Sequence, residues 1–211
     1  EQAAQVSLDG VTKMRVRLID CVGYIVPSAL GYIEGDQPRM VKTPWYEEAI
    51  PFNMAAEIGT RKVITEHSTI GLVITTDGSI SDIPREEYAE AEERVIDELK
   101  QINKPFVVLL NCMYPSSADS AALAASLTEK YSVPVIPVNC LELEEDDIKK
   151  ILSRVLFEFP IKEICIDFPK WINSLPLDHW LRNDLINSIR KLSENICHIR
   201  DIKCFESAFK D

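Results

Sequence analysis

Residues 105–111 read Pro-Phe-Val-Val-Leu-Leu-Asn, an apolar run that ends on a polar side chain. A strand of this kind has no polar face to present to water, so both of its faces must be covered. Similar runs occupy residues 69–76 and 133–139, and helical patterns occupy residues 85–101, 120–131 and 144–157. Strands that alternate with helices form right-handed β-α-β units. We therefore predict an α/β domain built on a mainly parallel sheet.

The first part of the chain predicts a different kind of pairing. Residues 5–8 and 14–19 flank Asp9-Gly10, a pattern typical of an antiparallel hairpin, which we expect to add one antiparallel strand at the sheet edge. Residues 24–51 follow as a long irregular segment, and loops of this length are usually functional or mobile. Residues 55–67 are predicted to be helical.

Polar residues stand where the predicted strands end, namely Asp20, Asp77, Asn111 and Asn139. In α/β sheets, ligands bind at the carboxyl ends of the strands. The shared placement predicts a nucleotide site at this edge, with Asn111 and Asn139 as its cofactor-binding residues.

Residues 16–23, Val-Arg-Leu-Ile-Asp-Cys-Val-Gly, are interpreted as a buried strand that ends at Asp20 and is followed by a glycine. A nucleoside triphosphatase needs a carboxylate at such a strand tip to hold Mg²⁺, usually through water. It also needs an amide without a Cβ nearby to approach the γ-phosphate. Asp20 is therefore the candidate metal ligand, and Asp20 and Gly23 are the candidate catalytic residues. The alternative is an ordinary tight turn, which uses the same residue types.

Two other strand ends each allow two interpretations. For residues 75–78, Thr-Thr-Asp-Gly, a hydroxyl-rich turn is favoured over a loop of the nucleotide pocket. Residues 111–114, Asn-Cys-Met-Tyr, begin like the guanine-reading N-K-x-D motif but lack its lysine and aspartate. Tyr114 cannot accept two hydrogen bonds from guanine as a carboxylate does, so adenine becomes possible. The alternative is that Asn111 only caps its strand.

Composition excludes some classes of partner. The formal net charge is −11, with 34 acidic and 23 basic residues, which argues against nucleic-acid binding by a broad basic face. No apolar run approaches the roughly 20 residues of a membrane span. The six cysteines lack C-x-x-C spacing, which is typical of reduced, cytosolic usage. The three histidines give little support to a histidine-centred mechanism.

The pattern changes near residue 160. Residues 161–167 alternate like a half-exposed strand, and a helix is predicted from about residue 177 to 199. We therefore expect a domain of residues 1–159, followed by the beginning of a second domain at residues 160–211. In the first domain, residues 43–48, Thr-Pro-Trp-Tyr-Glu-Glu, are either a partner surface or a contact that packs the long segment onto the sheet.

Longer stretches carry a more specific signal. They are residues 17–24 (RLIDCVGY), 38–40 (PRM), 43–48 (TPWYEE), 55–64 (AAEIGTRKVI), 66–71 (EHSTIG), 73–78 (VITTDG), 90–96 (EAEERVI) and 179–182 (HWLR). In these stretches the chain closely resembles the stage IV sporulation protein A family, the spore-coat morphogenetic ATPases of endospore-forming Firmicutes. The resemblance spans nearly the whole chain.

The resemblance implies a P-loop GTPase-like (TRAFAC-type) domain that hydrolyses ATP with Mg²⁺, followed by the start of an α+β middle domain. Asp20 matches the family's Walker B aspartate. The family is implied to self-assemble into a homopolymer, the basement layer of the spore coat. This layer would lie in the mother-cell cytoplasm, peripheral on the forespore outer membrane. A small amphipathic sporulation peptide would anchor it there, and other spore-coat proteins would assemble on it.

The phosphate-binding part of such a site is expected outside this sequence. A G-x-x-x-x-G-K-[S/T] loop and the family's paired sensor threonines would lie upstream of Glu1, so we expect this chain by itself to be inactive. Two rival functions remain open at this point. One is a nucleotide-free structural assembly module, and the other is a GTPase-like signalling switch.

Overall fold

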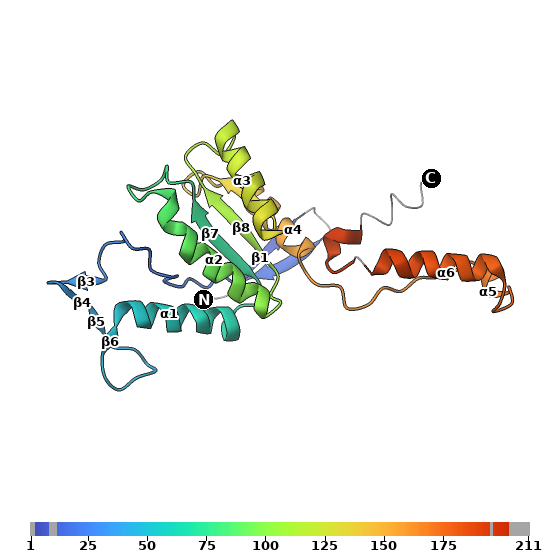
Figure 1. Ribbon diagram of the computed structural model, residues 1–211, viewed down its shortest axis with the longest axis horizontal. Coiled ribbons are helices and arrows are strands. Elements are labelled where there is room, and N and C mark those ends of the chain that lie inside the picture. Colours follow the sequence, from blue (N-terminus) through green and yellow to red (C-terminus); the bar gives the residue numbers. More distant parts are fainter. Residues whose placement is uncertain (1–2, 9–11, 195, 203–211) are drawn as a thin grey trace. The chain divides into compact units, whose positions relative to one another are not determined.

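The apolar run at residues 105–111 forms the middle strand of a three-stranded parallel sheet in the computed structural model of the chain (Figure 1). The strands are β7 (Gly71–Thr76), β8 (Phe106–Asn111) and β9 (Val135–Val138), in the order β7-β8-β9. Both pairings are parallel. The predicted parallel α/β arrangement is confirmed for these elements.

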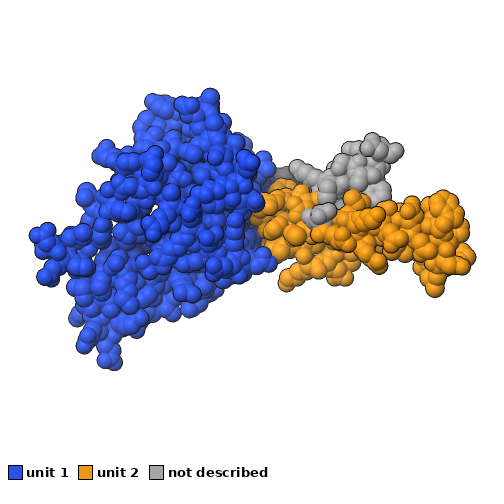
Figure 2. Space-filling model, in the orientation of Figure 1, with its two compact units in different colours: residues 1–155 blue, residues 156–211 orange. Residues whose placement is uncertain are grey.

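The structure describes residues 3–8, 12–194 and 196–202, and the chain divides into two units, residues 1–155 and 156–211 (Figure 2). The sheet belongs to the first unit. Within the described ranges, none of the helices is both long enough and apolar enough to cross a membrane.

Helices α2 (Arg85–Gln101) and α3 (Ala118–Tyr131) connect the strands and cover one face of the sheet (Figure 1). Helix α3 begins two residues before the prediction because the Ser117 hydroxyl accepts a hydrogen bond from the amide of Ser120 and so caps the helix. Helix α4 (Glu145–Phe157) follows β9. The core between strands and helices is formed by Val73, Val108, Leu110, Ile96, Leu99, Ala124, Leu127 and Tyr131.

Strand β7 lies at an edge of the sheet and is covered on one face only. Val73 is buried, but on the opposite face Leu72 is 36% exposed and Ile74 is 62% exposed. The prediction that this strand is buried on both faces is therefore wrong for its second face. The middle strand differs, because Val107 and Leu109 are buried on that side.

The predicted hairpin at the start of the chain is confirmed as β1 (Ala4–Ser7) paired antiparallel with β2 (Lys13–Val16). Its turn, Asp9-Gly10, lies outside the described residues. The hairpin forms a two-stranded sheet of its own, so the prediction that it adds an edge strand to the main sheet is wrong in this structure.

The prediction of a buried strand that ends at Asp20 is wrong. Strand β2 ends at Val16, and residues 17–22 are irregular and exposed. The reason lies in the register, because Val16 pairs with Ala4 at the start of β1. Because β1 begins at Ala4, this strand offers no backbone partner to the residues after Val16.

The long segment at residues 24–51 contains two short pairings before the helix. Strands β3 (Ile33–Glu34) and β4 (Gln37–Pro38) form one, and β5 (Met40–Val41) and β6 (Ile50–Pro51) form the other. Helix α1 (Phe52–Lys62) then continues into a π-helical turn at Val63–His67, which confirms the predicted helix and starts it three residues earlier.

The second unit contains the helices α5 (Lys170–Asn173) and α6 (Trp180–Ser193) and a 3₁₀ turn at Ile199–Ile202. The strand predicted at residues 161–167 is wrong. A segment of alternating polarity forms a β-strand only where a neighbouring segment supplies the backbone donors and acceptors for its hydrogen bonds. Among the described residues, only the bridge Pro160–His198 and its two flanking hydrogen bonds provide one. Helix α6 begins about three residues later than predicted because the His179 ring accepts from the amide of Leu181 and caps the helix, and it ends at Ser193.

Candidate functional site

Three of the four polar strand ends meet at one edge of the sheet. Thr76 is paired with Asn111, and Asn111 is paired with Val138, so Asp77, Asn111 and Asn139 end neighbouring strands at the same level. This confirms their predicted placement. Asp20 differs, because it lies on the irregular, exposed segment after β2 and outside the three-stranded sheet.

The amide side chains of Asn111 and Asn139 join the loops that follow β8 and β9. Asn111 Oδ1 accepts from the amide of Cys140 at 3.0 Å. Asn139 Nδ2 donates to the carbonyl of Met113 at 3.4 Å, and its Oδ1 accepts from the amide of Leu141 at 3.1 Å. Both side chains therefore brace the two loops, and their contact with a cofactor stays a prediction.

The loop after β7 is the hydroxyl-rich turn that the sequence favours. Thr76 Oγ1 accepts from the amide of Gly78, and Asp77 Oδ1 accepts from the amide and the hydroxyl of Ser79 at 2.9 and 2.6 Å. Gly78 has a φ of +88°, which suits glycine. Ser79 Oγ in turn accepts from the amide of Met113 at 2.9 Å, so this loop is joined to the loop after β8.

The amide of Gly23 already has a partner. It donates to Oγ1 of Thr60 at 3.0 Å, and Thr60 is buried in α1. Gly23 has a φ of +81°, in the left-handed region that favours glycine. Sequence reasoning missed Thr60, because nothing in a helical threonine signals a contact with a residue 37 positions earlier.

The segment that follows Gly23 is held against α2. The hydroxyl of Tyr24 donates to Glu98, and the Arg94 guanidinium lies 4.1 Å from the centre of the Tyr24 ring. Burial, followed by the hydrogen bond to Glu98, raises the pKa of Tyr24 above its ordinary range. The amide and hydroxyl of Ser28 both donate to Glu87, at 2.9 and 2.8 Å.

These contacts could have been signalled by the spacing of charges in α2. Glu87, Arg94 and Glu98 stand seven and four residues apart, which places them on one helix face. The sequence analysis recognised the helix but did not assign that face a role.

A buried polar network connects α2 with α3. Glu92 is 4% exposed and accepts two hydrogen bonds from Arg85 Nη2, at 2.7 and 2.8 Å. The hydroxyl of Tyr131 donates to the same carboxylate at 2.7 Å. Burial and this hydrogen bond raise the pKa of Tyr131 to about 12. A buried carboxylate with two partners fixes the spacing of the two helices.

The structure also decides the role of Trp45. A Cβ placed on Gly59 of α1 would lie 3.2 Å from the Trp45 ring, and Lys62 Nζ lies 6.0 Å from the centre of that ring. Trp45 therefore packs the long segment onto helix α1, whereas the packing interpretation places this contact on the sheet. Its neighbour Tyr46 remains 46% exposed.

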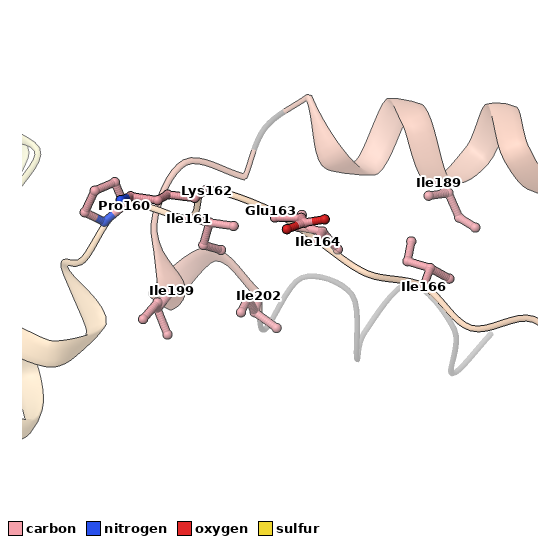
Figure 3. A pocket seen from close by; sticks show the side chains of 9 residues that line it. All are labelled: Pro160, Ile161, Lys162, Glu163, Ile164, Ile166, Ile189, Ile199 and Ile202. Carbon is pink, nitrogen blue, oxygen red and sulfur yellow. The ribbon is translucent and has the colours of Figure 1, made fainter.

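The second unit has an apolar groove with a volume of about 730 Å³. Figure 3 shows isoleucine side chains from the chain near residue 164, from α6 and from the 3₁₀ turn along it. Its lining residues are Pro160, Ile161, Lys162, Glu163, Ile164, Ile166, Ile189, Ile199 and Ile202. A lining with so few polar groups does not resemble a catalytic site.

Within the described ranges, no group of three or more His, Cys, Asp or Glu side chains is arranged to hold a metal ion. Mg²⁺ in nucleotide sites is usually held by one or two carboxylates together with water and substrate phosphates. A single exposed carboxylate such as Asp20 is compatible with that pattern.

The fold and the joined loops at the carboxyl edge define an α/β protein of the class that binds ligands at its strand ends. The model of the family "Stage IV sporulation protein A, ATPase domain" matches residues 1–160, and "Stage IV sporulation protein A, middle domain" matches residues 161–211. The chain belongs to the stage IV sporulation protein A family. The resemblance found in the sequence is thereby confirmed.

Curated relatives agree with this assignment. Stage IV sporulation protein A of Clostridioides difficile (strain 630) is 46% identical over 207 residues, which are 98% of this chain and 42% of the relative. The proteins of the same name from Bacillus anthracis and Bacillus subtilis (strain 168) are 48% and 47% identical over 201 residues. Those residues are 95% of this chain and 41% of each relative, so the chain spans about two fifths of their length. No solved structure matches the chain.

Proposed function

We propose that this chain carries the main part of the ATPase domain of a morphogenetic scaffold that hydrolyses ATP and self-assembles into the basement layer of the spore coat. The observation that carries the proposal is the match of residues 1–160 to the family's ATPase domain. The joined loops at the carboxyl edge of β7, β8 and β9 support it, because parallel α/β sheets bind nucleotides at this edge.

In the proposed site, Asp20 holds Mg²⁺ and the amide of Gly23 faces the γ-phosphate. Bound Mg²⁺ would neutralise the phosphate charge that develops during hydrolysis. Because the Gly23 amide donates to Thr60 in the structure, phosphate binding would have to replace that hydrogen bond. Asn111 and Asn139 belong to the cofactor-binding side through the loops that they brace.

We further propose that the domain is P-loop GTPase-like, with residues 1–159 in the ATPase domain and residues 160–211 at the start of the middle domain. In this proposal a strand that leads into a G-x-x-x-x-G-K-[S/T] loop lies beside β7. Strand β7 lies at the edge of the sheet formed by the described residues, which supports the idea because an edge strand can pair with a further strand. The exposed residues 17–22 would then find a partner as well.

The proposed assembly is a homopolymer in the mother-cell cytoplasm, peripheral on the forespore outer membrane. A small amphipathic sporulation peptide would anchor it, and other coat proteins would bind on top. The name of the relatives supports a role in sporulation. The net charge of −11 speaks against a nucleic-acid partner.

The test is Asp20→Ala in the intact protein, with ATP turnover as the readout. We expect turnover to be abolished, because the Mg²⁺ ligand is removed. Asp178→Ala is the matched control, since Asp178 is an exposed aspartate in the second unit. Unchanged turnover in Asp20→Ala would refute the role of Asp20.

One observation favours a second candidate, a nucleotide-free assembly module. The polar atoms of Gly23, Asn111 and Asn139 described above are engaged with the protein itself. Calorimetry of the 211-residue chain with Mg-ATP tests whether the chain binds nucleotide by itself, and we expect no binding. Micromolar binding would contradict our account of the phosphate-binding loop. A strong preference of the intact protein for GTP would instead favour the signalling switch.

A further inference from the structure

The amide of Gly23 is held by a side-chain hydroxyl from a distant part of the chain. It donates to Oγ1 of Thr60 at 3.0 Å, across 37 positions of sequence. A backbone amide carries a single hydrogen, so it serves one strong acceptor at a time. In the proposed site the γ-phosphate needs the same hydrogen. Thr60 and the γ-phosphate would therefore compete for one donor.

The two partners of this hydrogen bond differ in their access to a ligand. Thr60 lies near the end of helix α1 and is only 2% exposed, and burial strengthens a hydrogen bond by excluding water from it. Gly23 is half-buried. Within the described part of the chain, no heavy atom beyond its sequence neighbours lies within 4 Å of the position that a Cβ on Gly23 would take. A ligand can therefore approach the amide, whereas the hydroxyl is shielded.

The residue after Gly23 is anchored independently of this bond. The Tyr24 hydroxyl donates to Glu98, and the Arg94 guanidinium lies 4.1 Å from the centre of the Tyr24 ring. Arg94 Nη2 also donates to Glu57 of helix α1 at 2.9 Å. Because these contacts hold Tyr24, Gly23 can exchange one acceptor for another without release of the segment that follows it.

We propose that Thr60 sets the preference of the site between ATP and ADP, by competing with the γ-phosphate for the amide of Gly23. The inference rests on the proposed ATPase function, in which that amide faces the γ-phosphate. ADP has no γ-phosphate and leaves the bond to Thr60 intact. The triphosphate must break this bond, so the energy of the bond is subtracted from its affinity. Thr60 is a positioning residue, because it acts through Gly23 rather than on the nucleotide.

The test measures the affinity of the intact protein for Mg-ADP and for a non-hydrolysable Mg-ATP analogue by calorimetry. Thr60→Val removes the hydroxyl and keeps the branched shape of the side chain. It should tighten binding of the analogue about fivefold, the factor that corresponds to a net hydrogen bond of about 1 kcal/mol. Binding of ADP should not change. Thr60→Ala also lacks the hydroxyl and should give the same gain, so the test does not depend on how well valine packs.

Two further variants serve as controls. Thr60→Ser keeps the hydroxyl and should bind both nucleotides like the parent. Thr65→Val removes a hydroxyl that donates to the carbonyl of Arg61 at 2.8 Å and makes no contact with Gly23, and it should change neither affinity. A merely structural role of Thr60 would weaken binding of both nucleotides or leave both unchanged, whereas competition tightens binding of the triphosphate alone.

Two results would overturn the inference while leaving the ATPase proposal intact. One is an affinity for the analogue that does not rise in Thr60→Val or in Thr60→Ala. The other is a change of equal size for ADP and for the analogue, which would mean that the hydroxyl acts on the site as a whole. Failure of the unaltered intact protein to bind either nucleotide would overturn the proposed function and this inference together.

Discussion

The Tyr131→Phe variant tests the buried network between α2 and α3 by removing a single oxygen atom. It removes the hydroxyl that donates to Glu92 at 2.7 Å and keeps the ring in the core. Glu92 retains its two hydrogen bonds from Arg85, so the carboxylate stays paired. The measured loss should therefore report the hydroxyl and not the collapse of the ion pair.

The strength of comparable hydrogen bonds gives the size of this loss. A hydrogen bond to a charged group contributes about 1.5–3 kcal/mol to folding. The pKa of Tyr131 rises from 10.0 to about 12, through burial first and the bond to Glu92 second, so the folded state favours the neutral phenol that donates this bond. We expect Tyr131→Phe to lower the free energy of unfolding by about 2 kcal/mol at pH 7.

The same numbers fix the pH dependence. The neutral phenol is the form that the folded state favours, so its pKa is higher in the folded chain than in the unfolded chain. The resulting stabilisation is fully present below pH 10 and is lost as the pH rises through about 12. The gap between parent and Tyr131→Phe should therefore be constant up to about pH 10 and close by about pH 12.

Urea unfolding followed by far-ultraviolet circular dichroism at pH 7, 10, 11 and 12 measures this gap. Tyr114→Phe is the control, because it makes the same chemical change at a side chain that is 70% exposed and should shift stability by less than about 0.5 kcal/mol. Equal midpoints for parent and Tyr131→Phe at pH 7 would refute the reasoning. So would a gap that persists undiminished at pH 12.

Three further substitutions test close contacts in the first unit. Gly71→Ala should lower the free energy of unfolding in urea by about 1–3 kcal/mol, because the new Cβ would lie 3.0 Å from the Cβ of Phe106 in the core. Gly59→Ala should lower it less, because its Cβ would meet only the ring of a partly exposed tryptophan. A smaller loss for Gly71→Ala than for Gly59→Ala would contradict this ranking. Thr60→Val should lower stability by about 1 kcal/mol and speed hydrogen exchange at the Gly23 amide, and unchanged exchange would show that the hydroxyl does not protect that amide.

The alternation of strands and helices from residue 69 to residue 157 could be predicted from the sequence because its signals are local. Continuous apolar runs mark β7, β8 and β9, and the charge-rich period of α2 marks a helix with the bounds observed, Arg85 to Gln101. The meeting of Asp77, Asn111 and Asn139 followed from parallel topology alone.

The remaining features of the fold depend on contacts with distant residues, which a local sequence pattern does not reveal. The apolar residues after Val16 and those at 161–167 have strand-like patterns, but a strand needs a neighbour to supply its hydrogen bonds, and the structure gives these segments too little of one. The bond from Gly23 to Thr60 and the contact of Trp45 with α1 join residues far apart in sequence. Such pairs follow from the path of the chain and not from its periodicity.

Two faces of helix α2 make contacts within the protein, and this limits the substitutions that the helix can accept. One face supplies Glu92 and its apolar neighbours to the core, and another holds the segment after Gly23 through Glu87, Arg94 and Glu98. Exposed positions such as Glu90 and Asp97 remain outside both sets of contacts. These are the places where α2 can accept new residues, and where a fluorophore can be attached to follow the helix without disturbing what it holds.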